Sequence, residues 1–108
     1  MYNERYVYVV VRKDMSPEMQ MVQSCHATLE VGFKSESYKV VTNLVLFEID
    51  NEKDLIDCSV KLQLEELDYE MFFEPDNQLG YTALATLPTY ERRIKAFNGL
   101  KLWTQTMS

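Results

Sequence analysis

The chain has 108 residues, a net charge of −6 at neutral pH and 46% hydrophobic residues. This length fits one domain with a single core, and we expect that domain to span residues 1–108. The longest apolar run, residues 6–11, is far too short to span a bilayer, and no secretory signal is expected, so the sequence favours a cytoplasmic protein with no membrane partner.

Charge is unevenly distributed along the sequence. Residues 48–76 carry eleven acidic and two basic residues, a local charge of −9, whereas the rest of the chain sums to +3. Nucleic-acid binding is driven by Lys and Arg, so the net charge argues against it, although a fold that separates the two regions would create a basic face. Alternatively, the acids solvate one exposed helix or dock on a basic partner.

The first two predicted elements are a strand and a helix. Residues 5–13 form a β-branched and aromatic run, typical of a strand covered on both faces in the middle of a sheet. Ser16 and Pro17 then begin an amphipathic helix that ends near Gly32. The repeat expected to face the core consists of Met19, Val22, Cys25 or His26, Leu29 and Phe33.

The rest of the chain continues the alternation of strands and helices. A strand is predicted over residues 40–49, a helix over 51–67, two strands over 68–74 and 81–87, and a last helix from about 88 to 97. Helices between strands imply parallel crossovers, and the short turn between the last two strands implies a hairpin. The sequence therefore predicts a three-layer α/β/α domain with a mixed sheet of four strands.

The two cysteines show no metal-ligand spacing. Cys25 and Cys58 fall on different predicted helices, and His26 is the only histidine, so we expect neither a metal nor a cofactor. We interpret both cysteines as reduced thiols, with a disulfide between them left open. A nucleophilic pair of Cys25 and His26 is disfavoured because neighbours on a helix point about 100° apart.

Two positions are candidates for site chemistry. His26 is either a structural residue at a half-buried position or a functional one. Asp76 follows a buried strand, and ligands of open α/β sheets bind at strand ends. Asp and Asn in this loop equally suit an ordinary turn.

Four stretches of sequence form a further pattern, and two of them contain His26 and Asp76. They are YVVVRKDM (8–15), QSCHATLE (23–30), EPDNQLGYTALA (74–85) and GLKLW (99–103). In this order they resemble the type II peptidyl-tRNA hydrolase family over nearly the whole chain. The resemblance implies a compact α/β domain, often a homodimer, that hydrolyses the ester between a peptide and the tRNA 3′ end without a metal.

The same resemblance implies roles for individual residues. His26 and Asp76 would be the catalytic acid–base pair acting on a water, and Gln23 and Thr82 would bind the substrate or that water. The further candidate contacts to substrate or phosphate are Arg12, Lys13, Asn77, Gln78, Arg92, Arg93 and Lys95. The expected partner is tRNA or peptidyl-tRNA.

The sequence departs from the family at one functional position. Met19 stands where the family has an active-site lysine, and the basic residues of the family's loop are represented only by Asn77 and Gln78. Losing one stabilising donor costs about 10²- to 10³-fold in rate, unless Arg12 or Lys13 compensates from the strand end. The alternative function is therefore a relative that binds tRNA, another RNA or a nucleotide-like small molecule without turnover.

Overall fold

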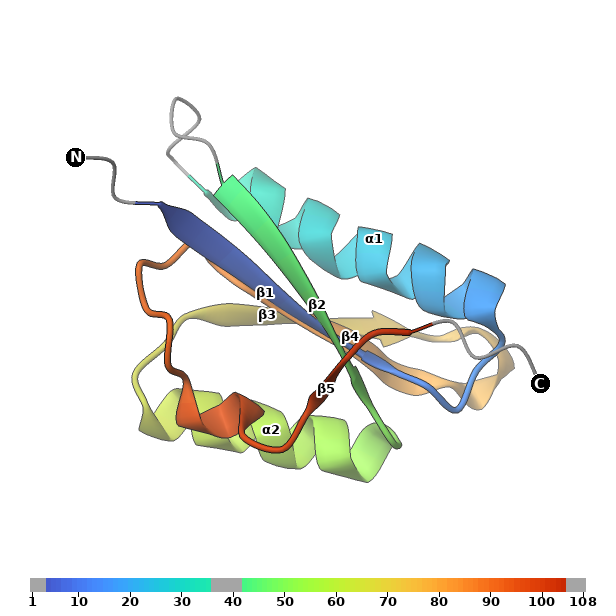
Figure 1. Ribbon diagram of the computed structural model, residues 1–108. Coiled ribbons are helices and arrows are strands. Elements are labelled where there is room, and N and C mark those ends of the chain that lie inside the picture. Colours follow the sequence, from blue (N-terminus) through green and yellow to red (C-terminus); the bar gives the residue numbers. More distant parts are fainter. Residues whose placement is uncertain (1–3, 36–41, 105–108) are drawn as a thin grey trace.

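Five strands form one mixed sheet in the computed structural model, which describes residues 4–35 and 42–104 (Figure 1). The strands are β1 (Arg5–Arg12), β2 (Thr42–Ile49), β3 (Tyr69–Glu74), β4 (Gly80–Thr86) and β5 (Lys101–Leu102), in the spatial order β3-β4-β1-β2-β5. β1 is parallel to β2 and antiparallel to β4, while β3 and β5 pair antiparallel with their neighbours. Hence β1, β2 and β3 all end at one edge of the sheet, here called the C-terminal edge.

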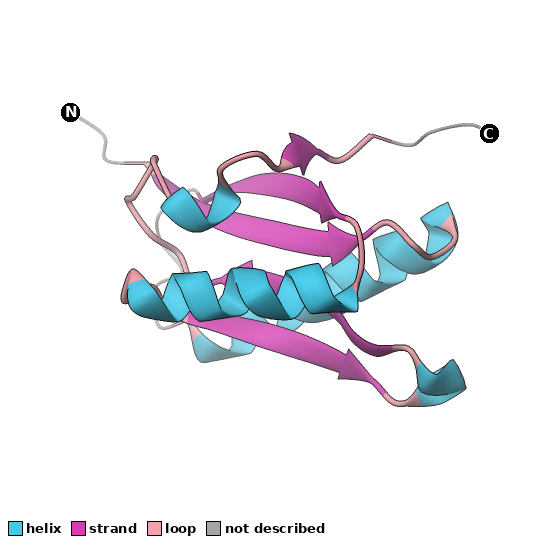
Figure 2. Cartoon of the chain, turned by 90° about the horizontal axis from the view of Figure 1, so that it is seen from below, coloured by secondary structure: helices cyan, strands magenta, loops and turns pink. Residues whose placement is uncertain are grey.

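The two helices lie on opposite faces of this sheet. α1 (Pro17–Lys34) packs on one face, and α2 (Glu52–Leu64) lies across the other, in front of the strands in Figure 2. Each helix begins at a side-chain cap: Ser16 Oγ accepts from Met19 N at 3.2 Å, and Asn51 Oδ1 accepts from Asp54 N at 2.9 Å. Because α1 follows the end of β1 and α2 follows the end of β2, both helix N-termini lie at the C-terminal edge.

β1 supplies the centre of the core. Val7, Val9 and Val11 face α1, whereas Tyr8 and Val10 face α2. All five side chains are buried, because a central strand between two helical layers is covered on both faces. The predicted α/β fold with the first strand at the centre is confirmed.

The predicted number of strands is corrected from four to five. The apolar tail of the chain forms β5, in which Lys101 and Leu102 pair with Glu48 and Phe47 of β2. A strand of two residues carries no alternating pattern, so the sequence gives no signal for it.

The helix predicted from Pro88 to about Phe97 is wrong. This segment is irregular and ends in a single 3₁₀ turn, η2 (Lys95–Phe97). Tyr6 and Thr89 exchange two backbone hydrogen bonds, and the Tyr8 hydroxyl donates to the carbonyl of Glu91. Contacts with β1 thus satisfy backbone groups that a helix would otherwise pair internally.

The face of α1 that packs on the sheet also differs from the prediction. The buried side chains are Gln20, Gln23, Ala27 and Val31. The side chains of the predicted apolar repeat, including Val22, Leu29 and Phe33, are mostly exposed. No helix in the described part of the chain is both long enough and apolar enough to cross a membrane.

Candidate binding site at the C-terminal edge

Gln23 and Thr82 are brought together by the fold. The Thr82 hydroxyl donates to Gln23 Oε1 at 2.5 Å, and Gln23 Nε2 donates to Glu74 Oε1 at 3.0 Å. Gln23 and Thr82 are both 0% exposed. In this conformation they join α1 to β3 and β4, and neither of them reaches the surface.

Arg12 is engaged by the protein itself. Its Nε and Nη2 each donate to one oxygen of Asp14 at 2.9 Å, and its Nη1 donates to the carbonyls of Leu79 and Tyr81 at 2.5 and 3.0 Å. The hydrogen bonds that Arg12 donates to Asp14 raise the pKa of Arg12 above its ordinary value. With four of its five N–H donors in use, the guanidinium is not available to a substrate.

The other candidate phosphate contacts do not form one basic patch. Lys13 Nζ lies 3.1 Å from Asp50 Oδ1, and the hydrogen bond that it donates to this carboxylate raises the pKa of the lysine. Arg92 lies over the ring of Tyr6, 5.0 Å from its centroid, at the start of β1. Because β1 is eight residues long, about 26 Å, the segment with Arg92, Arg93 and Lys95 lies at the opposite edge of the sheet from Arg12 and Lys13.

His26 and Asp76 are both exposed, and the structure does not join them. The His26 ring stacks on Phe72 of β3, with centroids 4.4 Å apart and planes within 3°. Asp76 lies beyond the end of β3, four residues after Phe72, which an extended chain spans in about 13 Å. Among the hydrogen bonds of the described residues, none links the two side chains or uses a ring nitrogen of His26.

The loop that carries Asp76 is strained and firmly held. It contains a 3₁₀ turn, η1 (Asp76–Gln78), in which Asn77 and Gln78 have φ of 55° and 56°. Leu79 and Tyr81, which follow, are fixed by Arg12, and the carboxylate of Glu52 accepts from Tyr81 N at 2.8 Å. The side chains of Asp76, Asn77 and Gln78 are exposed to solvent, and these hydrogen bonds hold the backbone that follows them.

Sequence reasoning missed two residues that build this edge. Glu74 accepts the hydrogen bond from Gln23, and Glu52 fixes the loop while also lying against Gly80, where a Cβ would come within 2.1 Å of its carboxylate. In the sequence, Glu52 is an acidic residue in the first turn of a predicted helix, where the helix dipole alone makes it favourable. Its contact with the loop before β4 is visible only in the structure.

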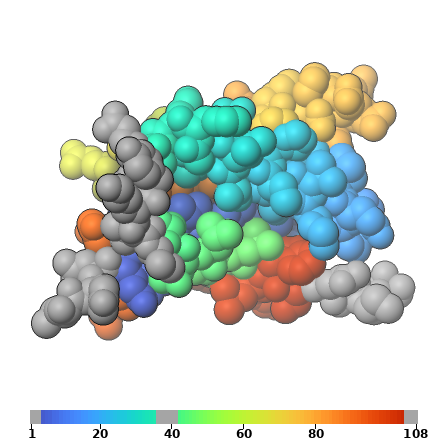
Figure 3. Space-filling model, turned by 90° about the horizontal axis from the view of Figure 1, so that it is seen from above, coloured from blue at the N-terminus to red at the C-terminus, as the bar shows by residue number. Residues whose placement is uncertain are grey.

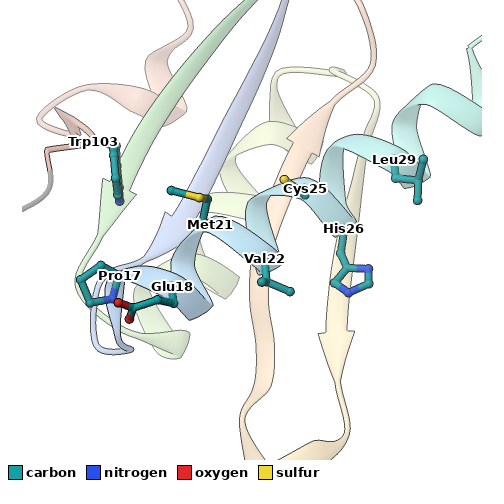
Figure 4. Close-up of a pocket in the computed structure, with 8 residues that line it drawn as sticks. All are labelled: Pro17, Glu18, Met21, Val22, Cys25, His26, Leu29 and Trp103. Carbon is teal, nitrogen blue, oxygen red and sulfur yellow. The ribbon is translucent and has the colours of Figure 1, made fainter.

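A separate, apolar hollow runs along the outer side of α1 (Figure 4). It has a volume of about 520 Å³ and is lined by Pro17, Glu18, Met21, Val22, Cys25, His26, Leu29 and Trp103. Met21 extends toward Trp103, whereas His26 points to the other side of the helix. Trp103 is held by a 2.7 Å hydrogen bond from its Nε1 to Gln20 Oε1.

Both cysteines are free thiols on opposite sides of the sheet. Cys25 is exposed on α1, while Cys58 is buried on the inner side of α2, with its Sγ 3.6 Å from the carbonyl oxygen of Ala96. Burial raises the pKa of the Cys58 thiol to about 11. Within residues 4–35 and 42–104, no three His, Cys, Asp or Glu side chains cluster as a metal site.

Comparison with known proteins identifies a structural likeness. No protein-family profile matches the sequence, and no curated protein matches it. A solved protein of unknown function from Agrobacterium tumefaciens strain C58 is similar, with a TM-score of 0.71 and 13% sequence identity, over 96% of this chain and all of that one. At this identity the likeness concerns the fold alone, a helix-covered mixed α/β sheet.

Proposed function

We propose that this protein binds a nucleotide-like ligand at the C-terminal edge without rapid turnover, as a non-hydrolytic relative of the type II peptidyl-tRNA hydrolases. The observation that carries the proposal is the strained loop at Asp76–Gln78. Two consecutive non-glycine residues there occupy the left-handed region. Asn adopts this region readily through local hydrogen bonds, but the conformation of Gln78 costs about 1–2 kcal/mol, and strain of this kind clusters at ligand clamps and catalytic sites.

The way the loop is held supports a binding role. Arg12 and Glu52 fix the backbone on the far side of the strained residues, so the loop keeps its conformation without a ligand. A preorganised loop loses little conformational freedom when a ligand binds. Its position also agrees with the usual place of ligands in open α/β sheets, outside the carboxyl ends of the strands.

The exposed side chains of the loop indicate the class of ligand. The Asp76 carboxylate can accept hydrogen bonds from the two hydroxyls of a ribose, and the amides of Asn77 and Gln78 can pair with the edge of a base. Arg12 and Lys13, the nearby candidate cations, are engaged by Asp14 and Asp50. A nucleoside moiety therefore suits the loop better than a phosphate backbone does.

The same ion pairs argue against rapid ester hydrolysis. An oxyanion requires a donor already aimed at it, and loss of one such donor lowers the rate about 10²- to 10³-fold. Met19 stands where the resembled family has a lysine, and the donors of Arg12 face Asp14 and two carbonyls. In this conformation neither strand-end cation replaces the lysine.

Calorimetry tests the proposal. Adenosine and AMP are titrated into the protein at low and high salt, with Asp76→Ala as the test variant and Asp68→Ala, an exposed carboxylate at the opposite end of β3, as the matched control. We expect salt-independent binding that Asp76→Ala weakens at least about tenfold and Asp68→Ala leaves unchanged. Absence of nucleoside binding, or equal effects of both variants, would reject the proposal.

Hydrolysis of peptidyl-tRNA is the second candidate function. The observation in its favour is the exposed imidazole of His26, which Phe72 holds in place while its ring nitrogens remain available to a water. The test is release of labelled peptide from N-blocked aminoacyl-tRNA by the wild type, His26→Ala and Asp76→Ala. A wild-type rate no greater than the reaction without enzyme removes this candidate.

A further inference from the structure

We infer that the outer long side of β3, here called the β3 flank, binds an extended peptide rich in lysine or arginine as an added strand of the sheet. β3 comes first in the order β3-β4-β1-β2-β5, so one of its long sides pairs with β4 and the other faces away from the sheet. In Figure 2, β3 is the strand that leads into η1, and it lies at the margin of the sheet, clear of α2. This binding does not depend on the proposed nucleoside site.

The backbone of β3 offers hydrogen-bonding groups on this side. Leu87 N donates to the carbonyl of Asp68, which makes these two residues a bonded pair of the β3–β4 ladder. Bonded and non-bonded residues alternate in an antiparallel ladder, so the next bonded residue of β3 is Glu70. The N–H and C=O groups of Tyr69 and Met71 therefore point outward. Outside the ladder, no hydrogen bond of the described residues uses them.

The helices cover the faces of β3 but leave the β3 flank open. On one face, Phe72 stacks on His26 of α1. Figure 3 views this face and shows the yellow atoms of the hairpin formed by β3 and β4 beside those of α1. On the other face, Tyr69 and Met71 border the core under α2 and are partly buried. In the described part of the chain, strand pairing leaves this side of β3 without a neighbour.

The structural protection of this edge strand is confined to its end. The register with β4 shifts between Phe72 and Phe73, which marks a bulge, and Pro75 follows the strand. Bulges and prolines keep edge strands from pairing with other chains. The first half of β3, residues 69–72, has a regular register and neither of these features. A short extended segment can therefore pair there.

Charge decides which segment fits. Between Lys61 and Arg92 the sequence has seven acidic residues and no lysine or arginine, and this stretch includes all of β3 and β4. Among the ion pairs of the described residues, the one that reaches this stretch joins Lys34 to Glu70 on the α1 face of the sheet. An acidic edge repels acidic segments and attracts basic ones.

A hollow beside the first half of β3 can hold a basic side chain. It has a volume of about 570 Å³, and its lining includes Glu66, Asp68 and Glu70 together with Leu67 and Met71. Glu66 and Asp68 are exposed and have no ion pair among the described residues. On an added strand, the side chain opposite Met71 lies on the same face as Met71. A lysine there would place its carbons on Leu67 and Met71 and its charge beside Glu66 and Asp68.

The same charges disfavour the other occupants of an open strand. A second copy paired through β3 would bring Glu70 of one chain close to the acidic residues of the other, and like charges on neighbouring strands are destabilising. A nucleic acid would add its own phosphates to this edge. A basic extended peptide gains both the backbone hydrogen bonds and the attraction of opposite charges.

Fluorescence anisotropy tests the charge. The labelled peptide Lys-Val-Lys-Val-Lys-Val is titrated with the full chain, and the same peptide with glutamate in place of lysine is its control. We expect only the lysine peptide to bind, and more weakly as salt rises. Asp68→Lys should raise its dissociation constant about fivefold or more, whereas Glu18→Lys, the same change at an exposed position on α1, should have little effect. Thermal melts establish that both variants are folded.

N-methylation of the peptide tests the backbone pairing. One peptide carries methyl groups on the lysine nitrogens and another on the valine nitrogens. Only one long side of an added strand bonds to β3, so one set of methyl groups should abolish binding and the other should not. The lysine set is decisive when the strand is antiparallel to β3, and the valine set when it is parallel. In NMR spectra, the amides of Tyr69 and Met71 should exchange more slowly with the peptide bound.

Four results would overturn the inference. They are no binding of the lysine peptide, the same outcome for both sets of methyl groups, equal effects of Asp68→Lys and Glu18→Lys, and no change at the two amides. Equal effects of the two variants would mean that the peptide responds to net charge alone. Protection of the Tyr69 and Met71 amides that rises with protein concentration in the absence of peptide would place a second copy on the β3 flank, which also contradicts it.

Discussion

The hydroxyl of Thr82 donates a 2.5 Å hydrogen bond to the side-chain oxygen of Gln23, and both residues are fully buried. Through its amide nitrogen, Gln23 also donates to Glu74. A chain of hydrogen bonds therefore runs from β4 through α1 to β3. Its first effect is to fix the helix against the sheet, because a buried polar group without a partner is costly.

Removing the hydroxyl should destabilise the protein. Thr82→Val keeps the shape of the side chain but leaves Gln23 Oε1 without its donor, so we expect a loss of about 1–3 kcal/mol in the free energy of unfolding. Gln23→Leu should cost a similar amount. Urea denaturation of both single variants and the double variant measures their coupling, expected at about 0.5–3 kcal/mol. Strictly additive losses would show that the two side chains act independently.

Arg12 should be irreplaceable by lysine. An ammonium cannot donate to both oxygens of Asp14 and to the carbonyls of Leu79 and Tyr81 in one geometry. We expect Arg12→Lys to lower the free energy of unfolding by about 2 kcal/mol and to speed hydrogen exchange in the loop before β4. Lys13→Arg, at an exposed position, is the control. Unchanged exchange at the amide of Leu79, which donates to the carbonyl of Asp76, would contradict the role given to Arg12.

Relieving the strain in the loop should raise the stability of the protein and lower its affinity for the ligand. Gln78 has a φ of 56°, where a side chain is unfavourable, so we expect Gln78→Gly to raise the free energy of unfolding by up to about 1 kcal/mol. The same change removes an amide proposed to contact the ligand, so nucleoside affinity should fall. Thermal melts and calorimetry on one preparation measure both effects. A variant that is neither more stable nor weaker in binding would show that the strain has no functional role.

Elements defined by local patterns are predictable from this sequence. The run of valines in β1 is typical of a central strand, and Ser16 with Pro17 sets the start of α1, as the structure confirms. These signals depend on neighbouring residues alone. The local pattern makes His26 and Asp76 candidates and the family resemblance pairs them, whereas the fold places both at the surface without joining their side chains among the described residues.

Features that depend on distant partners are not predictable in this way. Gln20 and Gln23 turn inward because Trp103, Thr82 and Glu74 supply their hydrogen bonds, and this rotates the apolar repeat of α1 to the outside. The irregular segment after Pro88 likewise finds its backbone partners on β1. A local sequence pattern predicts that glutamine is exposed, because it contains no information on a partner more than fifty residues away.

Gly32 should be replaceable with a gain in stability. It lies within α1, where glycine costs about 0.5–1 kcal/mol relative to alanine, and a Cβ there meets nothing within 4 Å in its own chain. We therefore expect Gly32→Ala to raise the melting temperature of the monomer. Gly80→Ala is the opposite case, because φ is +73° and a Cβ would clash with Glu52. If Gly32→Ala lowers the melting temperature in dilute solution, the position is crowded within the monomer.

The buried thiol of Cys58 should make stability depend on pH in alkaline solution. Burial raises the pKa of this thiol from 9.0 to about 11. Between these values the unfolded chain has lost the thiol proton while the folded chain retains it, so the free energy of unfolding falls as pH rises from 9 to 11. Below pH 9 the contribution is fully present. We expect a loss of about 1–3 kcal/mol across this window.

Two variants isolate the contribution of this thiol. Tyr8 and the exposed lysines also titrate in alkaline solution, so the informative quantity is the difference in slope between the wild type and Cys58→Ala. Denaturation at pH 8, 9, 10 and 11 should give a shallower slope for Cys58→Ala, whereas Cys25→Ser, which removes the exposed thiol, should follow the wild type. Thiol labelling at pH 8 should modify Cys25 quickly and Cys58 only on unfolding. Equal slopes in the wild type and Cys58→Ala would mean that the thiol ionises as readily in the folded state as in the unfolded state.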